Sequence, residues 1–454
     1  MPIRGKSKAF PTGTSVGFRA GGNYSRLASH GGRGADAGAD ERQNRGGTIW
    51  AAGTVIGRRT ILCLGLSQLI SWGISYYLIG GFGALIATDL GWSRDSVYGG
   101  FSVALLVMGL TSSMTGRLID RHGGRRVMLT GALFHAVGCA GIALCHTLPV
   151  YYAAWICLGL AMRLTLYDAA FAALVRIGGA AAKRPMAQVT LLGGLAATVF
   201  WPLGHLLASE IGWRGALLAY AGFAILTMPL HLAIPNGSIA ADAAADPLPA
   251  HRPLAHRRQD RIIAGALYTL IIALVNFLNS GMSAHMIDIL AGLGLTAAAA
   301  VWIAALRGIG QSTARLGEVL FGRRLDPLVL NLLAALVLPA SFVAGLFSGE
   351  FIWAAVAFAF CYGAGNGIVT ITRGTLPLAL FEHRTYGAFV GRLLVPSFVL
   401  SAASPVIYAM VIQRFGDDGA LYLSVGVTIV ILAAAVALKL RFGRGARRRA
   451  PVPS

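Results

Sequence analysis

Long apolar runs separated by short polar stretches fill most of the chain between residues 58 and 441. A helix that crosses a bilayer needs about 20 mostly apolar residues, and twelve runs come close to or exceed that length. We therefore expect transmembrane helices near residues 60–87, 97–116, 127–147, 149–175, 186–209, 215–234, 262–287, 297–321, 327–347, 351–381, 386–412 and 419–438. The fourth and tenth runs exceed one straight crossing, which predicts tilt or a kink, with Pro377 as its cause in the tenth.

A polar stretch divides the twelve runs into two equal groups. Residues 236–261 are rich in Ala, Pro and Arg, which predicts a cytoplasmic linker between an N-terminal bundle at 58–235 and a C-terminal bundle at 262–441. Residues 1–57 contain no long apolar run and are rich in Gly, Ser, Ala and Arg, so we expect a disordered basic tail. Residues 442–454 form a second basic tail.

The composition excludes an ordinary soluble protein. Hydrophobic residues make up 56% of the chain and charged residues only 12%, whereas about 25% of a soluble domain is charged. With so few charges the chain cannot cover its surface in water. The sequence therefore predicts an all-α protein embedded in a membrane.

The net charge of +20 suggests nucleic acid, but the placement of the basic residues points to a membrane. With the amino terminus in the cytoplasm, about 30 of the 38 Lys and Arg residues fall in inner loops and tails, and three fall in outer loops, Arg94, Arg214 and Arg414. This asymmetry is the positive-inside rule, and it predicts cytoplasmic termini. Anionic lipid headgroups are then the expected partners of the charge, and nucleic acid is the less favoured alternative.

The loop after the second run carries a specific motif that contains Gly116, Asp120, Arg121, Gly123, Arg125 and Arg126. Gly123 allows a tight reversal into the next helix, and Asp120 can pair with arginines or cap a helix end. The motif resembles the G-x-x-x-D-R-x-G-x-R-R loop of the major facilitator superfamily. The resemblance implies twelve helices in two six-helix halves, with this loop clamping the halves together on the cytoplasmic side. The alternative is a basic loop that only sets topology.

The second half repeats the first. Aligning Arg323-Arg324 with Arg125-Arg126 places Glu318 on Asp120, and Gly215-Ala-Leu matches Gly419-Ala-Leu, at offsets of 198 and 204 residues. Such a repeat predicts two bundles related by a pseudo-twofold axis, with the substrate site near the midplane between them.

Further short patches resemble bacterial members related to monocarboxylate porters. They are Gln68-Leu-Ile-Ser-Trp72-Gly73, Gly91-Trp92-Ser93-Arg94 and Gly212-Trp213-Arg214. That group also has an arginine in its eighth helix, which Arg315 approximates, although Leu316 stands where a proline is usual and Gln311 where an aspartate is usual. The resemblance favours an organic anion as substrate.

Charges inside a membrane are costly, so the few that occur are candidates for function. Asp168 is the only acid well inside the first half, and it lies about one and a half helical turns from Arg163. Two interpretations of Asp168 stay open, a fixed structural ion pair with Arg163 and a proton-coupling carboxylate. Arg373 lies near the matching position of the second half, so the two charges could close across the cavity and open on binding.

Arg307, Gln311 and Arg315 recur every four residues in the eighth run, so they share one helix face, with Glu318 a turn beyond. A guanidinium group can grip a carboxylate through two parallel hydrogen bonds, and we expect both arginines to contact an anion. The alternative for Arg315 is a part in the cytoplasmic gate, neutralised by Glu318.

Polar and aromatic side chains on other runs complete the predicted substrate site: Asn276, Asn366, Trp72 and Tyr76, with Asn279, Gln68 and Tyr77 beside them. Amides in a membrane can instead bridge helices. His135, His205 and His285 lie on different runs without metal-ligand spacing, and no phosphate-binding loop or catalytic motif stands out, so we expect no metal, no cofactor and no enzyme activity.

Together these features predict a secondary carrier of the bacterial inner membrane that works by alternating access. The expected substrate is a small organic solute, with an anion such as a monocarboxylate favoured and proton coupling expected. A proton-driven exporter of drugs or metabolites is the alternative within the class, and a membrane sensor that binds solute without moving it is the alternative outside it. We expect a monomer.

Overall fold

The computed structural model describes residues 56–178, 182–235, 254–255, 257–321, 326–381, 393 and 395–447. These residues form fourteen helices, and no strand occurs among them. The helices are α1 (Arg58–Ile74), α2 (Leu78–Leu90), α3 (Arg94–Leu110), α4 (Ser112–His122), α5 (Gly124–Ala143), α6 (Leu148–Thr165), α7 (Tyr167–Gly178), α8 (Lys183–Gly194), α9 (Ala196–Leu232), α10 (Arg258–Gly292), α11 (Ala297–Phe321), α12 (Pro327–Gly345), α13 (Ile352–Leu380) and α15 (Val395–Arg447).

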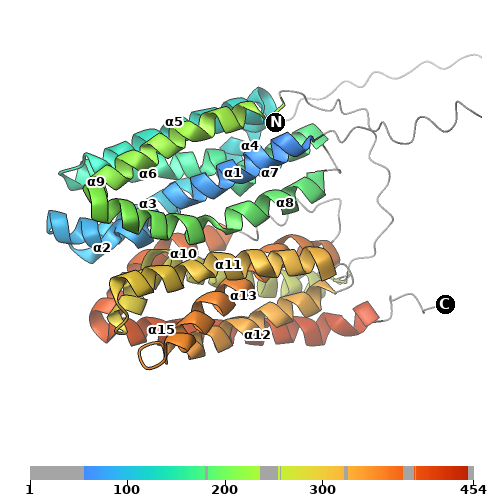
Figure 1. Cartoon of the computed structure of the whole chain (residues 1–454). Coiled ribbons are helices and arrows are strands. Elements are labelled where there is room, and N and C mark those ends of the chain that lie inside the picture. Colours follow the sequence, from blue (N-terminus) through green and yellow to red (C-terminus); the bar gives the residue numbers. More distant parts are fainter. Residues whose placement is uncertain are drawn as a thin grey trace, which may run out of the picture. The chain divides into compact units, whose positions relative to one another are not determined.

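Within residues 54–454 the helices gather into two bundles, α1–α9 and α10–α15 (Figure 1). In the first bundle α5 packs on α6 and α9, and in the second α13 packs on α11 and α12. The bundles meet where α2 packs on α10, α3 on α15, and α8 and α9 on α11. The predicted all-α membrane fold in two bundles is confirmed.

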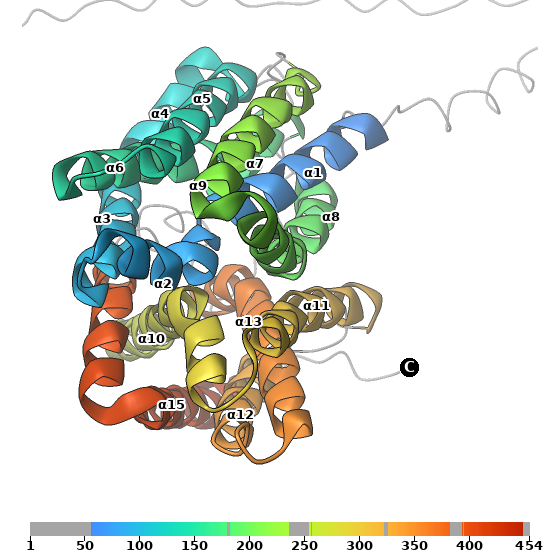
Figure 2. The ribbon, with the colours of Figure 1, turned by 60° about the vertical axis from the view of Figure 1, so that its left-hand side comes forward.

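Two glycines show the internal repeat in the backbone. Gly212 interrupts α9 and Gly416 interrupts α15, both with φ of 72°, in the left-handed region that favours glycine. The two positions lie 204 residues apart, the offset of the Gly-Ala-Leu repeat. At each of them the chain turns back, as Figure 2 shows for both helices. We name the end of the bundles with these two turns the distal end, and the end with Arg58 and Arg447 the terminal end.

By length and composition, eight helices of the described residues can cross a membrane, or nine when the bent pair α3–α4 is taken as one span. Two of these contain the turns at Gly212 and Gly416 and are long enough for two crossings each, because a helix rises only 1.5 Å per residue. The helix α11, which contains Arg307, Arg315 and Glu318, is not among these eight. With α11 added and the two long helices divided, the segments are consistent with the twelve predicted.

Several first-bundle segments are broken in mid-length. Ser75–Tyr77 separate α1 from α2, and Leu166 separates α6 from α7. The long fourth run is therefore interrupted, as its length predicts, although no proline lies at the break. In the tenth run α13 continues through Pro377 as one helix to Leu380, and a kink at Pro377 stays a prediction.

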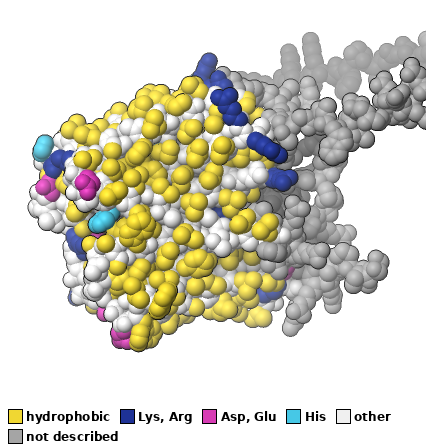
Figure 3. Space-filling model, viewed as in Figure 1, with side chains coloured by type: hydrophobic (Ala, Val, Ile, Leu, Met, Phe, Trp, Pro, Cys, Tyr) yellow, Lys and Arg dark blue, Asp and Glu magenta, His cyan; other side chains and the backbone are white. Residues whose placement is uncertain are grey.

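The surface is that of a membrane protein. Figure 3 shows hydrophobic side chains over the whole middle of the visible face, with Lys and Arg gathered at the terminal end. Large apolar side chains such as Leu110, Trp353 and Leu440 are more than 70% exposed, which favours burial in lipid.

The bundle limits differ slightly from the predicted ones. The second bundle begins with α10 at Arg258, four residues before the expected start, and α15 extends to Arg447, beyond the expected end at 441. Within the predicted linker, the backbone of Leu254 and Ala255 donates to the carbonyl groups of Ala379 and Leu380. The predicted tail at 1–57 lies almost wholly outside the described residues, as do most of the linker and residues 448–454.

Candidate functional site

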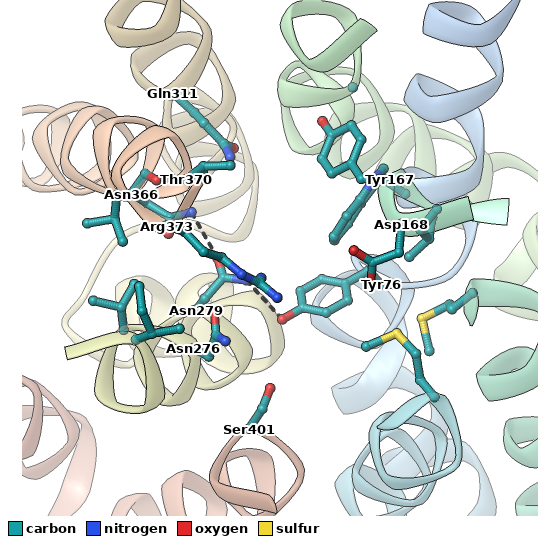
Figure 4. A pocket seen from close by; sticks show the side chains of 18 of the residues that line it. Tyr76, Tyr167, Asp168, Asn276, Asn279, Gln311, Asn366, Thr370, Arg373 and Ser401 are labelled. Carbon is teal, nitrogen blue, oxygen red and sulfur yellow. Dashed lines mark hydrogen bonds between the residues drawn. The ribbon is translucent and has the colours of Figure 1, made fainter. Parts of the chain in front are cut away.

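A cavity with a volume of about 150 Å³ lies between the two bundles. A buried water needs roughly 10–15 Å³ by the same measure, so about ten waters, or one small organic molecule, would fill it. Its wall comes from both halves of the chain (Figure 4). The polar and aromatic residues of the wall are Trp72, Tyr76, Tyr77, Arg163, Tyr167, Asp168, Asn276, Asn279, Gln311, Arg315, Asn366, Thr370, Arg373, Phe398 and Ser401.

The aromatic part of the wall is built on the broken helices. Tyr76 and Tyr77 lie in the break between α1 and α2, where the amide of Tyr77 donates to the carbonyl of Trp72 at 3.1 Å. Trp72 contacts Tyr76 and Tyr167, with ring centroids 4.9 and 5.0 Å apart. Beside the break at Leu166, Gln68 Nε2 donates to the carbonyl of the buried Thr165, the last residue of α6, at 2.7 Å. The breaks therefore turn aromatic rings toward the cavity without leaving that carbonyl group unpaired.

The predicted coupling pair forms in the structure. Arg163 Nη1 donates to Asp168 Oδ2 at 2.6 Å, and Arg163 also donates to the carbonyl of Ser112 at 3.3 Å. The Asp168 side chain is 55% exposed, so solvent reaches this part of the cavity.

Arg373 reaches into the same cavity from the opposite wall, on α13 (Figure 4). Its guanidinium group makes no ion pair among the described residues, and Asp168 lies more than 4 Å from it in this conformation. Asp168 and Arg373, which lies near the position that matches Asp168 in the second half, thus face one cavity without pairing with each other.

Arg307 occupies a different place from the one expected. It is fully buried and does not belong to the cavity wall. Its Nη2 donates to Asn279 Oδ1 at 2.5 Å and its Nη1 to Ser283 Oγ at 3.0 Å, while the rings of Tyr77 and Tyr362 flank it at 5.5 and 5.0 Å. Arg307 therefore lies behind the cavity wall. At its position on α11, the shared face contacts α10 and α13 and not the cavity.

Gln311 and Arg315 do line the cavity. Arg315 bridges the bundles, since it donates to the carbonyl of Thr190 at 2.6 Å and to Thr370 Oγ1 at 3.2 Å. It lies 3% exposed and without a carboxylate partner among the residues described, and the predicted pairing with Glu318 is not formed. Gln311 Oε1 is also buried, and it accepts no hydrogen bond from the described residues.

The amides form a network in the second bundle. Asn366 Nδ2 donates to Asn279 Oδ1 at 3.0 Å, and Asn279 Nδ2 donates to Tyr76 Oη of the first bundle at 2.9 Å (Figure 4). Asn276 lines the cavity one helical turn before Asn279. The network holds the two bundles together at the cavity wall and sets the direction of the amide groups.

The distal end of the cavity is closed by contacts between the bundles. Asp288 on α10 accepts from Tyr98 Oη at 2.5 Å and from Arg94 Nη2 at 3.1 Å, both on α3. His285, one turn earlier, lies against the Tyr98 ring with centroids 4.0 Å apart. This cluster, Arg94, Tyr98, His285 and Asp288, is named the distal lock below.

The predicted gating loop lies apart from the cavity at the terminal end. Gly123 has φ of 82° and forms the reversal between α4 and α5. Arg176 on α7 donates to the carbonyl groups of Ile119 and Asp120, and Arg125 Nε donates to the carbonyl of Ile234 at 2.7 Å.

The charged groups of this loop make few contacts with other side chains. The Asp120 carboxylate is exposed and forms no ion pair within the described ranges. The flanking Gly116, Arg121 and Arg126 are half-buried or exposed. The repeat partners Arg323 and Arg324 lie outside the described residues.

Tyr167, Ser401 and Asp288 are among the residues of the cavity or its closure that were not predicted as site residues. Tyr167 precedes Asp168, and an aromatic residue beside a membrane carboxylate is a usable signal. Asp288 ends an apolar run that the prediction placed at 262–287, and Ser401 lies in an apolar run with nothing to distinguish it. In the described part of the chain, no three His, Cys, Asp or Glu side chains lie close enough to hold a metal ion.

Comparison with known proteins finds a family and solved structures with a similar architecture. A family model described as Major Facilitator Superfamily matches residues 61–394. No curated protein sequence matches the chain. Among solved structures, a mutant of the nucleoside transporter NupG superposes with a TM-score of 0.65 at 11% identity, covering 84% of this chain and 99% of that one. A bacterial homolog of the human lysosomal transporter Spinster, inward-facing and occupied, gives 0.61 at 15% identity, covering 87% and 98%.

Proposed function

Since the chain belongs to the major facilitator superfamily, we propose that it is a secondary transporter that carries a small organic anion across the membrane by alternating access. Members of this superfamily move solutes between two bundles around a central site. The cavity between the bundles is the expected place for that site, and its volume suits a small molecule.

The observation that carries the anion assignment is the unpaired guanidinium group of Arg373 in the cavity wall. The wall contains three arginines, Arg163, Arg315 and Arg373, against the single acid Asp168, so its formal charge is +2. A guanidinium group out of bulk water is best matched by a carboxylate, which accepts two parallel hydrogen bonds from it. The aromatic rings of Trp72, Tyr76 and Tyr167 suit an apolar body attached to that carboxylate.

The conformation fits one step of the transport cycle. The distal lock closes one end of the cavity, whereas the exposed Asp168 lies on the side that leads to the terminal end. With both termini in the cytoplasm, as the basic residues of loops and tails predict, this is an inward-facing state of a bacterial inner-membrane protein. The basic loop that contains Gly116, Asp120 and Arg121, with Glu318 of the second bundle, would close the cytoplasmic side in the opposite state.

Proton coupling is the role that we assign to Asp168. It is the acid of the cavity wall, and its partner Arg163 also holds the carbonyl at the break between α3 and α4. Protonation of Asp168 would release Arg163, and Arg373 on the opposite wall would compete for the charged carboxylate when the cavity narrows. Import with a proton is therefore the favoured mode.

Transport by the purified protein in liposomes tests this proposal. The solutes are benzoate, lactate and acetate, each compared with its neutral primary amide, and uptake is measured with and without an imposed inward proton gradient. We expect uptake of at least one carboxylate, acceleration by the gradient, and no uptake of the amides. Extrusion driven by the gradient would favour an exporter, and binding without movement would favour a sensor. Failure of every carboxylate to bind would overturn the anion assignment.

A further inference from the structure

A chain of hydrogen bonds leads from buried Arg307 to the hydroxyl group of Ser401 in the cavity wall. Asn279 accepts from Arg307 Nη2 at 2.5 Å and donates to Tyr76 Oη at 2.9 Å. Tyr76 Oη lies 3.1 Å from Ser280 Oγ, and Ser280 Oγ is hydrogen-bonded to Ser401 Oγ. The chain passes from α11 to α10, crosses to the first bundle at Tyr76, and returns to α10 and α15.

The direction of the first two bonds in this chain follows from Arg307. An arginine side chain carries five N–H donors and no acceptor, so the atom of Asn279 that faces Arg307 must be its oxygen. Asn366 Nδ2 donates to the same oxygen at 3.0 Å, which fixes the amide further. The nitrogen of Asn279 then faces Tyr76, and the phenol oxygen accepts.

Each hydroxyl group has one hydrogen to give. Tyr76 Oη already accepts from Asn279, and among the described residues Ser280 Oγ is the acceptor within hydrogen-bond distance of its own hydrogen, so we assign this bond as donated by Tyr76. In that arrangement the fully buried Ser280 gives its hydrogen to Ser401 Oγ. For the hydrogen of Ser401 there is no acceptor among the described residues, and its side chain points into the cavity (Figure 4).

From this geometry we infer that Ser401 is a substrate-binding residue that donates a hydrogen bond to the carboxylate of the transported anion, and that Arg307 is the positioning residue that fixes its donor direction. The inference rests on the proposed function, because it names a further contact for the anion in the same cavity. Successive bonds of one direction polarise each other, and the positive charge at the start strengthens the donor at the end. Arg307 thus acts on the substrate without touching it.

Affinity measurements on the full chain test the inference, with benzoate and benzamide as probes and calorimetric titration as the readout. We expect Ser401→Ala to weaken benzoate binding about tenfold, the effect of one hydrogen bond to a charged acceptor. Ser401→Thr keeps a hydroxyl group and should keep the affinity. The matched control is Ser341→Ala, which removes another buried helical hydroxyl group, one bonded to the carbonyl of Leu338 away from the cavity.

A double-mutant cycle distinguishes a directed chain from independent contacts. Tyr76→Phe breaks the chain between Asn279 and Ser280, so it should weaken benzoate binding by itself. Ser401→Ala added to Tyr76→Phe should then cost less than it costs in the wild type, because the donor direction of Ser401 is already lost. Melting curves of each variant show that it is folded.

The outcomes separate the two proposals. The inference on Ser401 would be overturned if Ser401→Ala left benzoate binding unchanged, or if the effects of Ser401→Ala and Tyr76→Phe simply added. Either result would leave the proposed anion transport intact. A wild type that binds none of benzoate, lactate and acetate would overturn both. Loss of benzoate binding in Ser401→Ala with full retention in Ser401→Thr and Ser341→Ala supports the assignment.

Discussion

Asp288 in the second bundle accepts hydrogen bonds from two side chains of the first, from Tyr98 Oη at 2.5 Å and from Arg94 Nη2 at 3.1 Å. The side chain of Asp288 is 11% exposed, so both bonds form largely out of water and are stronger than surface contacts. In the proposed transport cycle, an outward-facing state requires the bundles to part at this place. The stability of the distal lock therefore sets part of the balance between the two states of the carrier.

Removing the charge of Asp288 should shift that balance. We expect Asp288→Asn to raise the population with a parted distal end, because the bond to Arg94 loses its charge and the rest of each bundle is untouched. Spin labels at Glu210 and Glu350, one on each bundle and both exposed, report the distal separation by pulsed electron resonance in a background without the five native cysteines. The fraction of molecules with the longer distance between the two labels should increase.

Asp89→Asn is the matched control. Asp89 pairs with Arg214 at the same end, but both residues belong to the first bundle. The distance distribution should therefore stay as in the wild type. An equal shift in both variants would mean that loss of charge at the distal surface, and not the lock between bundles, changes the separation.

Arg373 should be needed for the anion. We expect Arg373→Gln to weaken carboxylate binding at least tenfold, since a charged hydrogen-bonded partner is lost from the cavity wall. Arg373→Lys should be intermediate, because it keeps the charge and loses the planar pair of donors. Arg414→Gln removes an arginine that lies over the Phe415 ring near the distal turn, and it should leave binding unchanged. Equal binding by Arg373→Gln and wild type contradicts the anion site.

Asp168 should carry the response to the proton gradient. In Asp168→Asn the side chain can no longer take up or release a proton, so an imposed gradient should fail to accelerate uptake, whereas exchange of solute without a gradient should continue. Uptake into liposomes at matched and unequal pH measures both. Asp326→Asn is the control, since Asp326 pairs with Lys439 within the second bundle at 2.8 Å. If the proton gradient accelerated uptake by Asp168→Asn as much as by the wild type, the ion pair of Asp168 with Arg163 would have only a structural role.

The sequence predicted the two bundles well because apolar runs of this length have one common explanation, a lipid environment. The gaps between the apolar runs also predicted a break in the chain near residues 212 and 416, where Gly212 and Gly416 form turns with positive φ. The break at Leu166 was not located, because no glycine or proline lies there. It is stabilised by Gln68, a residue 97 positions away from the carbonyl that it binds.

The candidate site was predicted only in part, because it too depends on contacts between residues far apart in the sequence. The shared face of Arg307, Gln311 and Arg315 is a property of one helix and could be read from spacing. Which part of that face meets the cavity depends on where α10 and α13 lie, and spacing carries no information about that. Arg307 thus lies behind the wall and Arg315 in it. The role that we propose for Ser401 depends on a chain of contacts among four other residues.

Substitutions of Asn279 and of Arg307 in the buried network should lower the free energy of unfolding by different amounts. Asn279→Ala leaves Arg307 Nη2 and Asn366 Nδ2 without their shared acceptor, and we expect it to lower the free energy of unfolding by about 2–4 kcal/mol. Arg307→Met removes the buried charge together with its need for partners, so it should cost less. Melting of both variants in the same detergent gives the order. A more harmful Arg307→Met would show that packing of the guanidinium group between Tyr77 and Tyr362 outweighs its desolvation.

The turn at Gly212 should be sensitive to any side chain, whatever its size. A Cβ at this position would meet nothing within 4 Å, so the cost of Gly212→Ala comes only from the positive φ and should be about 1–2 kcal/mol. Gly222→Ala is the matched control on the same helix, because its surroundings are equally open and its φ is not in the left-handed region. That change should be neutral or stabilise by up to about 1 kcal/mol, as alanine is the better helix former. Thermal unfolding of the two variants should therefore move in opposite directions, and equal shifts would mean that the distal turn does not depend on its glycine.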